Sequence, residues 1–164
     1  MSISVQLAAS ITSMSKTINR AYSVSNVLSK KFNPLEFTGE FEASLGKPDK
    51  AFSAIIFGGS GQGKTEAAIK FAKYLTNFGK VAYDSLEQGL SATIQSALIR
   101  NHMDTCGNSF ILLDREPFED LIVRMSKPKS PDFLFIDSVH GIAGLHGGIG
   151  IQDRGQQRLI FTVG

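Results

Sequence analysis

The chain has 164 residues, of which 42% are hydrophobic and 20% are charged, and its formal net charge is +2. These values are typical of one ordinary globular domain and do not indicate a strongly basic nucleic-acid-binding protein. The single cysteine excludes an internal disulfide, and no apolar run reaches the ~18–20 residues that a transmembrane helix needs. We therefore expect a cytoplasmic protein without a membrane-spanning segment.

The N-terminal segment, residues 1–31, differs in composition from the rest of the chain. It contains eight serines, four basic residues and no acidic residue. We interpret it as a flexible or helical arm that contacts a partner, with a short helix over residues 24–31. Because organelle transit peptides are also rich in serine and poor in acids, targeting is the alternative interpretation. Residues 32–164 are predicted to form the folded core.

Within this core, short apolar runs alternate with patterns of helical period. The apolar runs predict unbroken strands, and the segments between them predict helices. Such alternation is typical of a three-layer α/β fold with a mostly parallel sheet that helices cover on both faces. In chain order we predict strand 52–57, helix 66–75, strand 80–83, helix 90–103, strand 110–113, helix 117–125, strand 133–136 and strand 159–163.

A glycine-rich loop follows the first predicted strand and leads directly into the first helix. Its sequence fits the pattern G-x-x-x-x-G-K-[ST], which is the signature of a phosphate-binding loop in this strand–loop–helix context. Glycines let the backbone wrap closely around a phosphate, so that successive N–H groups point inward. The residues concerned are Gly58, Gly59, Ser60, Gly61, Gln62, Gly63, Lys64 and Thr65, with Glu66 following in the helix.

The last residues of this loop carry the predicted chemistry. The N-terminus of the helix adds unpaired N–H groups and a positive dipole end. Lys64 is predicted to reach the β- and γ-phosphates, and the Thr65 hydroxyl to bind Mg²⁺. No Asn-Lys-x-Asp pattern for reading guanine is present. We therefore expect ATP, with Mg²⁺, as the ligand.

Two further carboxylates are predicted at the carboxyl ends of strands, the edge where ligands bind in open α/β sheets. Asp137 follows four apolar residues, which is the Walker B arrangement of a metal-binding acid. Glu87 follows the strand over 80–83, where a carboxylate could orient or deprotonate the attacking water. On spacing alone, Asp84 competes with Glu87 for that role.

These motifs together resemble the RecA-like P-loop ATPases, in particular the RadA, KaiC and DnaB types. The segment Tyr83-Asp84-Ser85-Leu86-Glu87 is similar to a family pattern whose glutamate is the catalytic base, and Asp137-Ser138 is similar to the family's Walker B ending. The resemblance implies a catalytic role for Glu87 rather than Asp84. It also implies a homo-oligomer, a bacterial or phage-infected cell, and single-stranded DNA as a partner.

The C-terminal part departs from that family, whose cores usually continue for several strands beyond the Walker B acid. Thr162 is the one candidate for the polar sensor, and Arg154 and Arg158 are candidates for a basic finger acting on a neighbouring subunit. The glycine-rich tract 141–150 stands where the family has a DNA-binding loop, but it carries no Phe, Tyr or Trp to stack on bases and no Lys or Arg. The RecA-like core is thus expected to be C-terminally short and incomplete.

The sequence favours an Mg²⁺-dependent ATPase, with Lys64 and Glu87 as catalytic residues and coupling to DNA recombination, repair or replication. A small-molecule kinase would share the phosphate loop, but it usually needs an arginine-rich lid, and Arg100, Arg115 and Arg124 are scattered. A nucleotide-gated binding module with little hydrolysis is the third hypothesis. The short C-terminal region and the N-terminal arm favour it.

Overall fold

The computed structural model describes residues 21–50, 52–137 and 158–162, the last five by their backbone alone. The chain divides into two compact units, Met1–Phe32 and Asn33–Gly164. In the first unit, helix α2 (Val24–Leu28) begins at a capping box, in which the Ser23 hydroxyl accepts from the backbone N–H of Asn26. This helix is shorter than the predicted 24–31, and none of its residues is buried.

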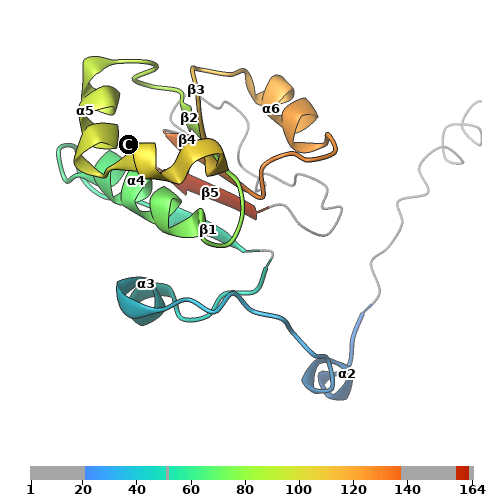
Figure 1. The fold of residues 1–164 in the computed structure, drawn as a ribbon. Coiled ribbons are helices and arrows are strands. Elements are labelled where there is room, and N and C mark those ends of the chain that lie inside the picture. The colour runs from blue at the N-terminus through green and yellow to red at the C-terminus, as the bar shows by residue number, and fades with distance from the viewer. Residues whose placement is uncertain (1–20, 51, 138–157, 163–164) are drawn as a thin grey trace, which may run out of the picture. The chain divides into compact units, whose positions relative to one another are not determined.

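The second unit is built on a five-stranded sheet in which every pair of neighbouring strands is parallel (Figure 1). The strand order is β1-β5-β4-β2-β3. The predicted α/β class and parallel sheet are therefore confirmed for the described residues. The strands are β1 (Ser53–Ile56), β2 (Val81–Ser85), β3 (Phe110–Leu113), β4 (Phe133–Asp137) and β5 (Arg158–Thr162).

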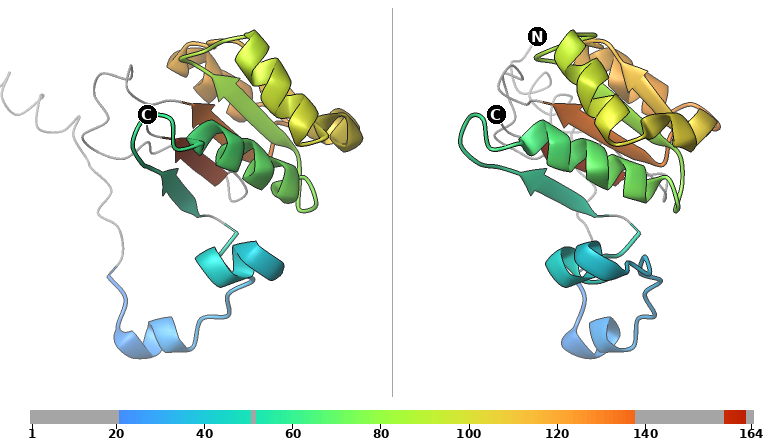
Figure 2. Two further views of the ribbon diagram at one scale, coloured as in Figure 1. Left: turned by 90° about the vertical axis from the view of Figure 1, so that its left-hand side faces the viewer. Right: turned by 60° about the vertical axis from the view of Figure 1, so that its left-hand side comes forward.

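Helices cover both faces of this sheet. Helices α4 (Lys64–Leu75) and α5 (Ala92–Arg100) contribute buried residues to one hydrophobic cluster, and α6 (Phe118–Met125) contributes to a second. Figure 2 shows α4 lying along the sheet. We call the two sides the α4 face and the α6 face. None of the described helices has both the length and the apolar character needed to cross a bilayer.

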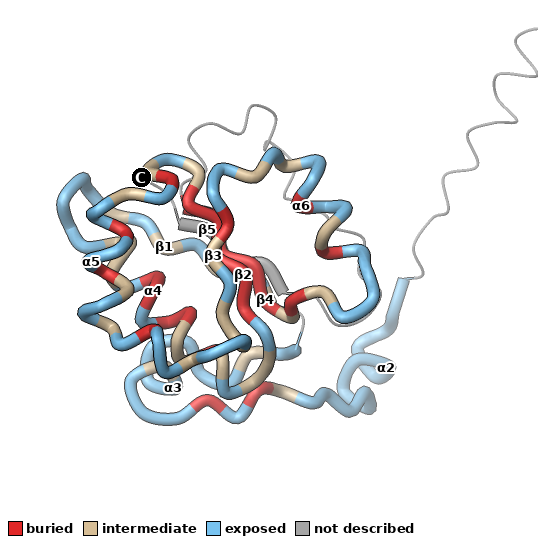
Figure 3. The backbone as a smooth tube through the Cα atoms, turned by 45° about the horizontal axis from the view of Figure 1, so that its top comes forward, coloured by how far each residue is buried: buried red, intermediate tan, exposed pale blue. Residues whose placement is uncertain are grey.

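The two central strands alternate between these faces. In β2, Val81 and Tyr83 belong to the α4-face cluster, whereas Ala82 belongs to the α6-face cluster. In β4, Phe133 and Phe135 pack on the α4 face, and the residues between them pack on the α6 face. All residues of both strands are buried (Figure 3). This explains why the strands read as unbroken apolar runs, since parallel strands covered on both sides have no solvent face.

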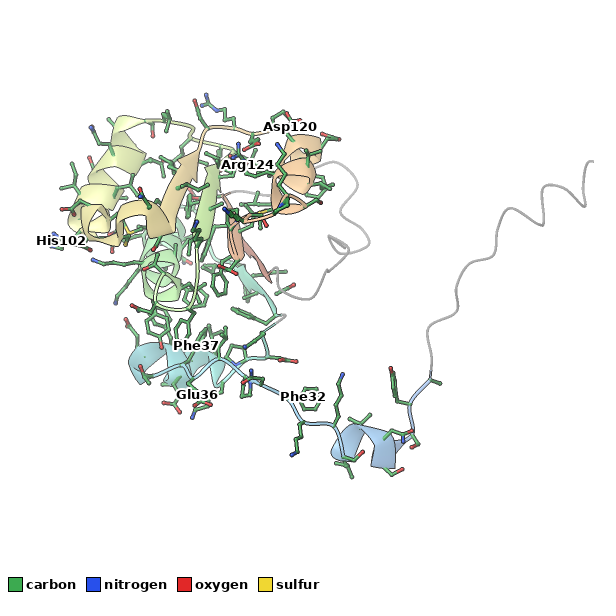
Figure 4. All side chains as sticks on the ribbon, turned by 45° about the vertical axis from the view of Figure 1, so that its right-hand side comes forward. Phe32, Glu36, Phe37, His102, Asp120 and Arg124 are labelled. Atoms are coloured by element: carbon green, nitrogen blue, oxygen red, sulfur yellow. The ribbon has the colours of Figure 1, made fainter. Side chains whose placement is uncertain are left out.

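The segment before β1 packs onto α4 through an aromatic cluster that the sequence did not predict. Phe37, labelled in Figure 4, is fully buried. Its ring makes edge contacts with Phe71 at 5.9 Å and Tyr74 at 5.3 Å between centroids. Helix α3 (Gly39–Leu45) follows, and its Phe41 stacks on the same two rings. Full burial of an aromatic ring contributes about 1.5–3 kcal/mol, so this cluster anchors the segment to the core.

The predicted helix 90–103 differs most from the structure. Helix α5 ends at Arg100, and His102 then adopts a left-handed conformation with φ 51°. A 3₁₀ segment, η1 (Met103–Ser109), leads into β3 with a further break at Gly107. Apolar periodicity continues through this turn because Met103 is buried in the same cluster as α5, which is why the pattern did not reveal the helix end.

Candidate functional site

The glycine loop lies between β1 and α4, as the sequence predicts. The backbone is left-handed at Gly61, with φ 75°, and at Gly63, with φ 74°. Side chains with a Cβ adopt this region only at a cost, which explains glycine at both positions. Gly63 is the N-cap of α4, and its carbonyl accepts the first helical hydrogen bond, from the N–H of Ala67 at 2.9 Å.

Two side chains of the loop fold back onto its own backbone. The Lys64 ammonium donates to the carbonyl oxygens of Gly58 at 3.0 Å and Gly59 at 2.8 Å. The Gln62 side-chain oxygen accepts from the N–H of Gly59 at 2.8 Å. A Cβ at Gly58 would lie 2.6 Å from that same oxygen, so a larger residue there would displace the Gln62 side chain. The two hydrogen bonds of Lys64 hold its ammonium group against the first residues of the loop.

The remaining N–H groups of the loop are available to an anion. Among the described residues, the backbone N–H groups of Gly61, Gly63 and Lys64 have no hydrogen-bond partner. The first N–H groups of α4 also lack intrahelical acceptors, as at any helix start. Free backbone donors at the positive end of a helix dipole, beside an ammonium group, are the arrangement that typically binds an anion.

The Asp137 carboxylate joins this loop to the sheet. Its Oδ2 accepts from the Thr65 hydroxyl at 2.9 Å and from the Tyr83 hydroxyl at 2.6 Å. Thr65 lies in the first turn of α4, Tyr83 in β2 and Asp137 at the end of β4, so three elements meet at one oxygen. Residues 72 positions apart in the chain are thus in direct contact, as the sequence-based assignment of both to one metal requires.

The Tyr83 hydroxyl is a buried hydrogen-bond donor to the Asp137 carboxylate. Its ring stacks on Phe135 with 5.7 Å between centroids, and it is fully buried. Burial, followed by the adjacent Asp137 charge, raises the pKa of the Tyr83 phenol far above its usual range. The phenol therefore stays protonated and stabilises the Asp137 carboxylate. The sequence analysis did not assign this role, because the register of β2 against β4, which places residues 83 and 137 on one face, cannot be read from the sequence.

The two candidates for the catalytic carboxylate lie in different surroundings. The backbone N–H of Glu87 donates to the Asp137 carbonyl at 3.2 Å, and the Glu87 side chain is exposed. Arg115 fixes the same turn by donating to the carbonyl oxygens of Glu87 and Gln88. Asp84 instead is fully buried, and its Oδ1 accepts from the N–H of Glu116.

Strand alternation separates Asp84 from the site. Tyr83 contacts Asp137 on the α4 face, so Asp84 points to the α6 face. Burial raises the pKa of the Asp84 carboxyl, while the Glu116 N–H lowers it and the charges of Glu116 and Asp114 raise it again. The structure therefore brings the turn at Glu87, and not the Asp84 side chain, to Asp137.

The Glu66 side chain links helix α4 to the end of helix α5. Its carboxylate accepts from Arg100 and from the Asn101 side chain, both at 2.6 Å, at the end of α5. The hydrogen bond from Arg100 lowers the pKa of the Glu66 carboxyl. Glu66 thus ties the first turn of α4 to α5, next to the loop.

The oxygens gathered here fit a hard divalent cation such as Mg²⁺. The Thr65 hydroxyl and the buried Asp137 carboxylate are oxygen ligands of the kind Mg²⁺ prefers. Nowhere in the part of the chain that the structure describes do three or more His, Cys, Asp or Glu side chains form a metal-binding group.

Neither the protein-family models nor the curated proteins contain a match to this chain.

Several predicted positions lie at or beyond the limits of the described residues. The glycine tract 141–150 and Arg154 are outside the described residues, and the side chains of Arg158 and Thr162 are not described. The backbone of Thr162 pairs with Asp137 on one side and with Ile56 on the other. Position 162 thus lies at the carboxyl end of β5, between the end of β1, which precedes the glycine loop, and Asp137 at the end of β4. Its sensor role stays a prediction.

Proposed function

We propose that this protein binds ATP with Mg²⁺ and hydrolyses it. The observation that carries the proposal is the hydrogen bond from Thr65 to Asp137, which joins the end of the glycine loop to the acid at the end of β4. Both residues were assigned to one metal on sequence grounds. Their contact, together with the free N–H groups of the loop, is the arrangement that a metal–triphosphate complex needs.

The individual roles follow from where each group lies. The loop amides and Lys64 bind the phosphates, and Lys64 leaves the carbonyls of Gly58 and Gly59 to do so. Thr65 and Asp137 would hold the metal ion, which would supply positive charge beside the phosphate oxygens. Glu87, whose backbone N–H donates a hydrogen bond to the Asp137 carbonyl, orients the attacking water and accepts its proton.

The wider assignment as a RecA-like ATPase coupled to DNA recombination, repair or replication rests on the sequence resemblance. On that basis we propose a homo-oligomer with single-stranded DNA as its partner. The parallel α/β sheet with helices on both faces supports this assignment at the level of fold class.

The kinase hypothesis has less support from the arrangement of the arginines. Arg100 is paired with Glu66, and Arg124 is paired with Glu116 at 2.8 Å. Arg115 donates to two carbonyls of the turn at Glu87. All three are thus engaged within the chain, whereas a kinase lid needs arginines directed at a bound substrate.

The test is ATP turnover by the wild-type chain and by Glu87→Gln, with and without single-stranded DNA. Removing a general base typically lowers the rate by about 10²–10⁴-fold, so we expect at least a hundredfold loss in Glu87→Gln with ATP affinity retained. Glu119→Gln, at an exposed position in the first turn of α6, is the control and should keep full turnover. Unchanged turnover in Glu87→Gln, together with tight ATP binding, would indicate the nucleotide-gated binding module instead.

A further inference from the structure

Three buried side-chain polar atoms have no hydrogen-bond partner within the described residues, and all belong to the segment where β2 ends. They are Asp84 Oδ2, Ser85 Oγ and Gln88 Oε1. A buried polar atom without a partner costs free energy, and folded proteins retain few of them. Three such atoms in one segment mark a place where the described residues leave hydrogen-bonding capacity unused.

Ser85 is the member of this group that faces the candidate site. It is the last residue of β2, 1% exposed, and its Cα pairs with that of Asp137 in β4. Because side chains two residues apart in a strand share a face, Ser85 lies on the α4 face with Tyr83. Neighbouring strands are about 4.8 Å apart, so the Ser85 hydroxyl is placed beside the Asp137 carboxylate.

Among the described residues, none forms a hydrogen bond with the Ser85 hydroxyl. The nearby Asp137 Oδ2 already accepts from Thr65 and Tyr83. Ser85 Oγ makes no hydrogen bond to either donor or to the backbone. An alanine would fill the same buried strand position without leaving a polar atom unsatisfied.

We propose that Ser85 is a positioning residue of the metal site, whose hydroxyl holds a water molecule of the Mg²⁺ hydration shell. The inference rests on the proposed function. Mg²⁺ keeps several of its waters when protein carboxylates and phosphates bind it, and those waters need acceptors. A hydroxyl can accept such a hydrogen bond, and Ser85 stands next to the metal-binding acid with its oxygen uncommitted.

The test compares Ser85→Ala with the wild type in thermal unfolding and in ATP binding, with Mg²⁺ and with EDTA. Without ligand, we expect the variant to unfold at the same or a higher temperature, because it loses only an unsatisfied group. Its ATP affinity in EDTA should be unchanged. The gain in ATP affinity that Mg²⁺ provides should fall about tenfold, as for a lost hydrogen bond to a charged group. Ser85→Thr, which keeps the hydroxyl, should retain most of that gain.

Ser91→Ala is the matched control, because the Ser91 hydroxyl has a partner, the N–H of Ile94 at 3.3 Å, and caps α5. This variant should unfold a few degrees lower without ligand and keep the full Mg²⁺ effect. The role of Ser85 would be wrong if Ser85→Ala lowered the unfolding temperature as Ser91→Ala does, or if it kept the full gain in ATP affinity from Mg²⁺. Either result would leave the proposed ATPase function standing. A wild-type chain whose ATP affinity ignores Mg²⁺ would overturn the proposed function together with the role of Ser85.

Discussion

Two buried aspartates near the same edge of the sheet have different environments. Asp137 lies on the α4 face, where its Oδ2 accepts from two side-chain hydroxyls, those of Thr65 and Tyr83. Asp84 lies on the α6 face, where its Oδ1 accepts one backbone N–H and its Oδ2 has no partner among the described residues. The pKa of the Asp84 carboxyl is raised, mainly by burial.

The difference shows that the face of the strand, and not only its end, decides what an acid can do. Only the α4 face opens onto the glycine loop, since Thr65 at the start of α4 contacts Asp137 there. On the α6 face, Asp84 lies near Glu116, which Arg124 of α6 binds through both carboxylate oxygens. Asp137 therefore faces the glycine loop, whereas Asp84 belongs to the contact between sheet and helix.

The largest expected effect comes from exchanging each acid for its amide. In Asp137→Asn, an oxygen remains to accept from Thr65 and Tyr83, but the charge that holds Mg²⁺ is lost. We expect ATP turnover to fall by at least about 100-fold, because stabilisation of transition-state charge contributes about that much. The gain in ATP affinity from Mg²⁺ should also disappear, as measured by calorimetry with Mg²⁺ and with EDTA.

Asp84→Asn is the matched control for that experiment, since it makes the same chemical change one strand away on the other face. It should keep both the turnover and the Mg²⁺ effect within about threefold of the wild type. If Asp84→Asn lost the Mg²⁺ effect while Asp137→Asn kept it, the assignment of the two faces would be wrong.

A smaller effect concerns the dependence of stability on pH. Because the folded-state pKa of Asp84 is raised, the folded chain binds a proton more tightly than the unfolded chain does. The stability linked to this group is present below the ordinary carboxyl pKa and is lost as pH rises through the raised value. The free energy of unfolding of Asp84→Asn should therefore increase relative to wild type between pH 4 and pH 8, as measured by urea titration. A difference that is constant with pH would show that Asp84 is not perturbed.

Much of the fold could be predicted because local signals and tertiary packing agree. The strand over 110–113 matches β3, and the predicted Walker B strand ends at Asp137 as β4 does. Helix α3 had no such signal, because it is short and its hydrophobic contacts depend on where Phe71 and Tyr74 lie. The break after Arg100 was missed because buried residues continue through it.

In the candidate site, too, some residues could be predicted from the sequence and others could not. The glycine loop and Asp137 were predictable because their chemistry fixes residue types at fixed spacing. The Tyr83 and Ser85 assignments needed the register of β2 against β4, which sequence alternation alone does not supply. Gln62, which bonds to the N–H of Gly59, was predicted as a loop residue, but its contact could not be inferred from the pattern.

The central claim is that the loop Gly58–Thr65 binds the phosphates of ATP, and equilibrium binding of ATP with Mg²⁺ tests it most directly. We predict binding by the wild type and affinity at least about 100-fold weaker in Lys64→Ala, because the ammonium contacts charged phosphates. Lys70→Ala, on the exposed side of α4 where Lys70 pairs with Glu40, should bind as the wild type does. Equal ATP affinity in wild type and Lys64→Ala would contradict the account.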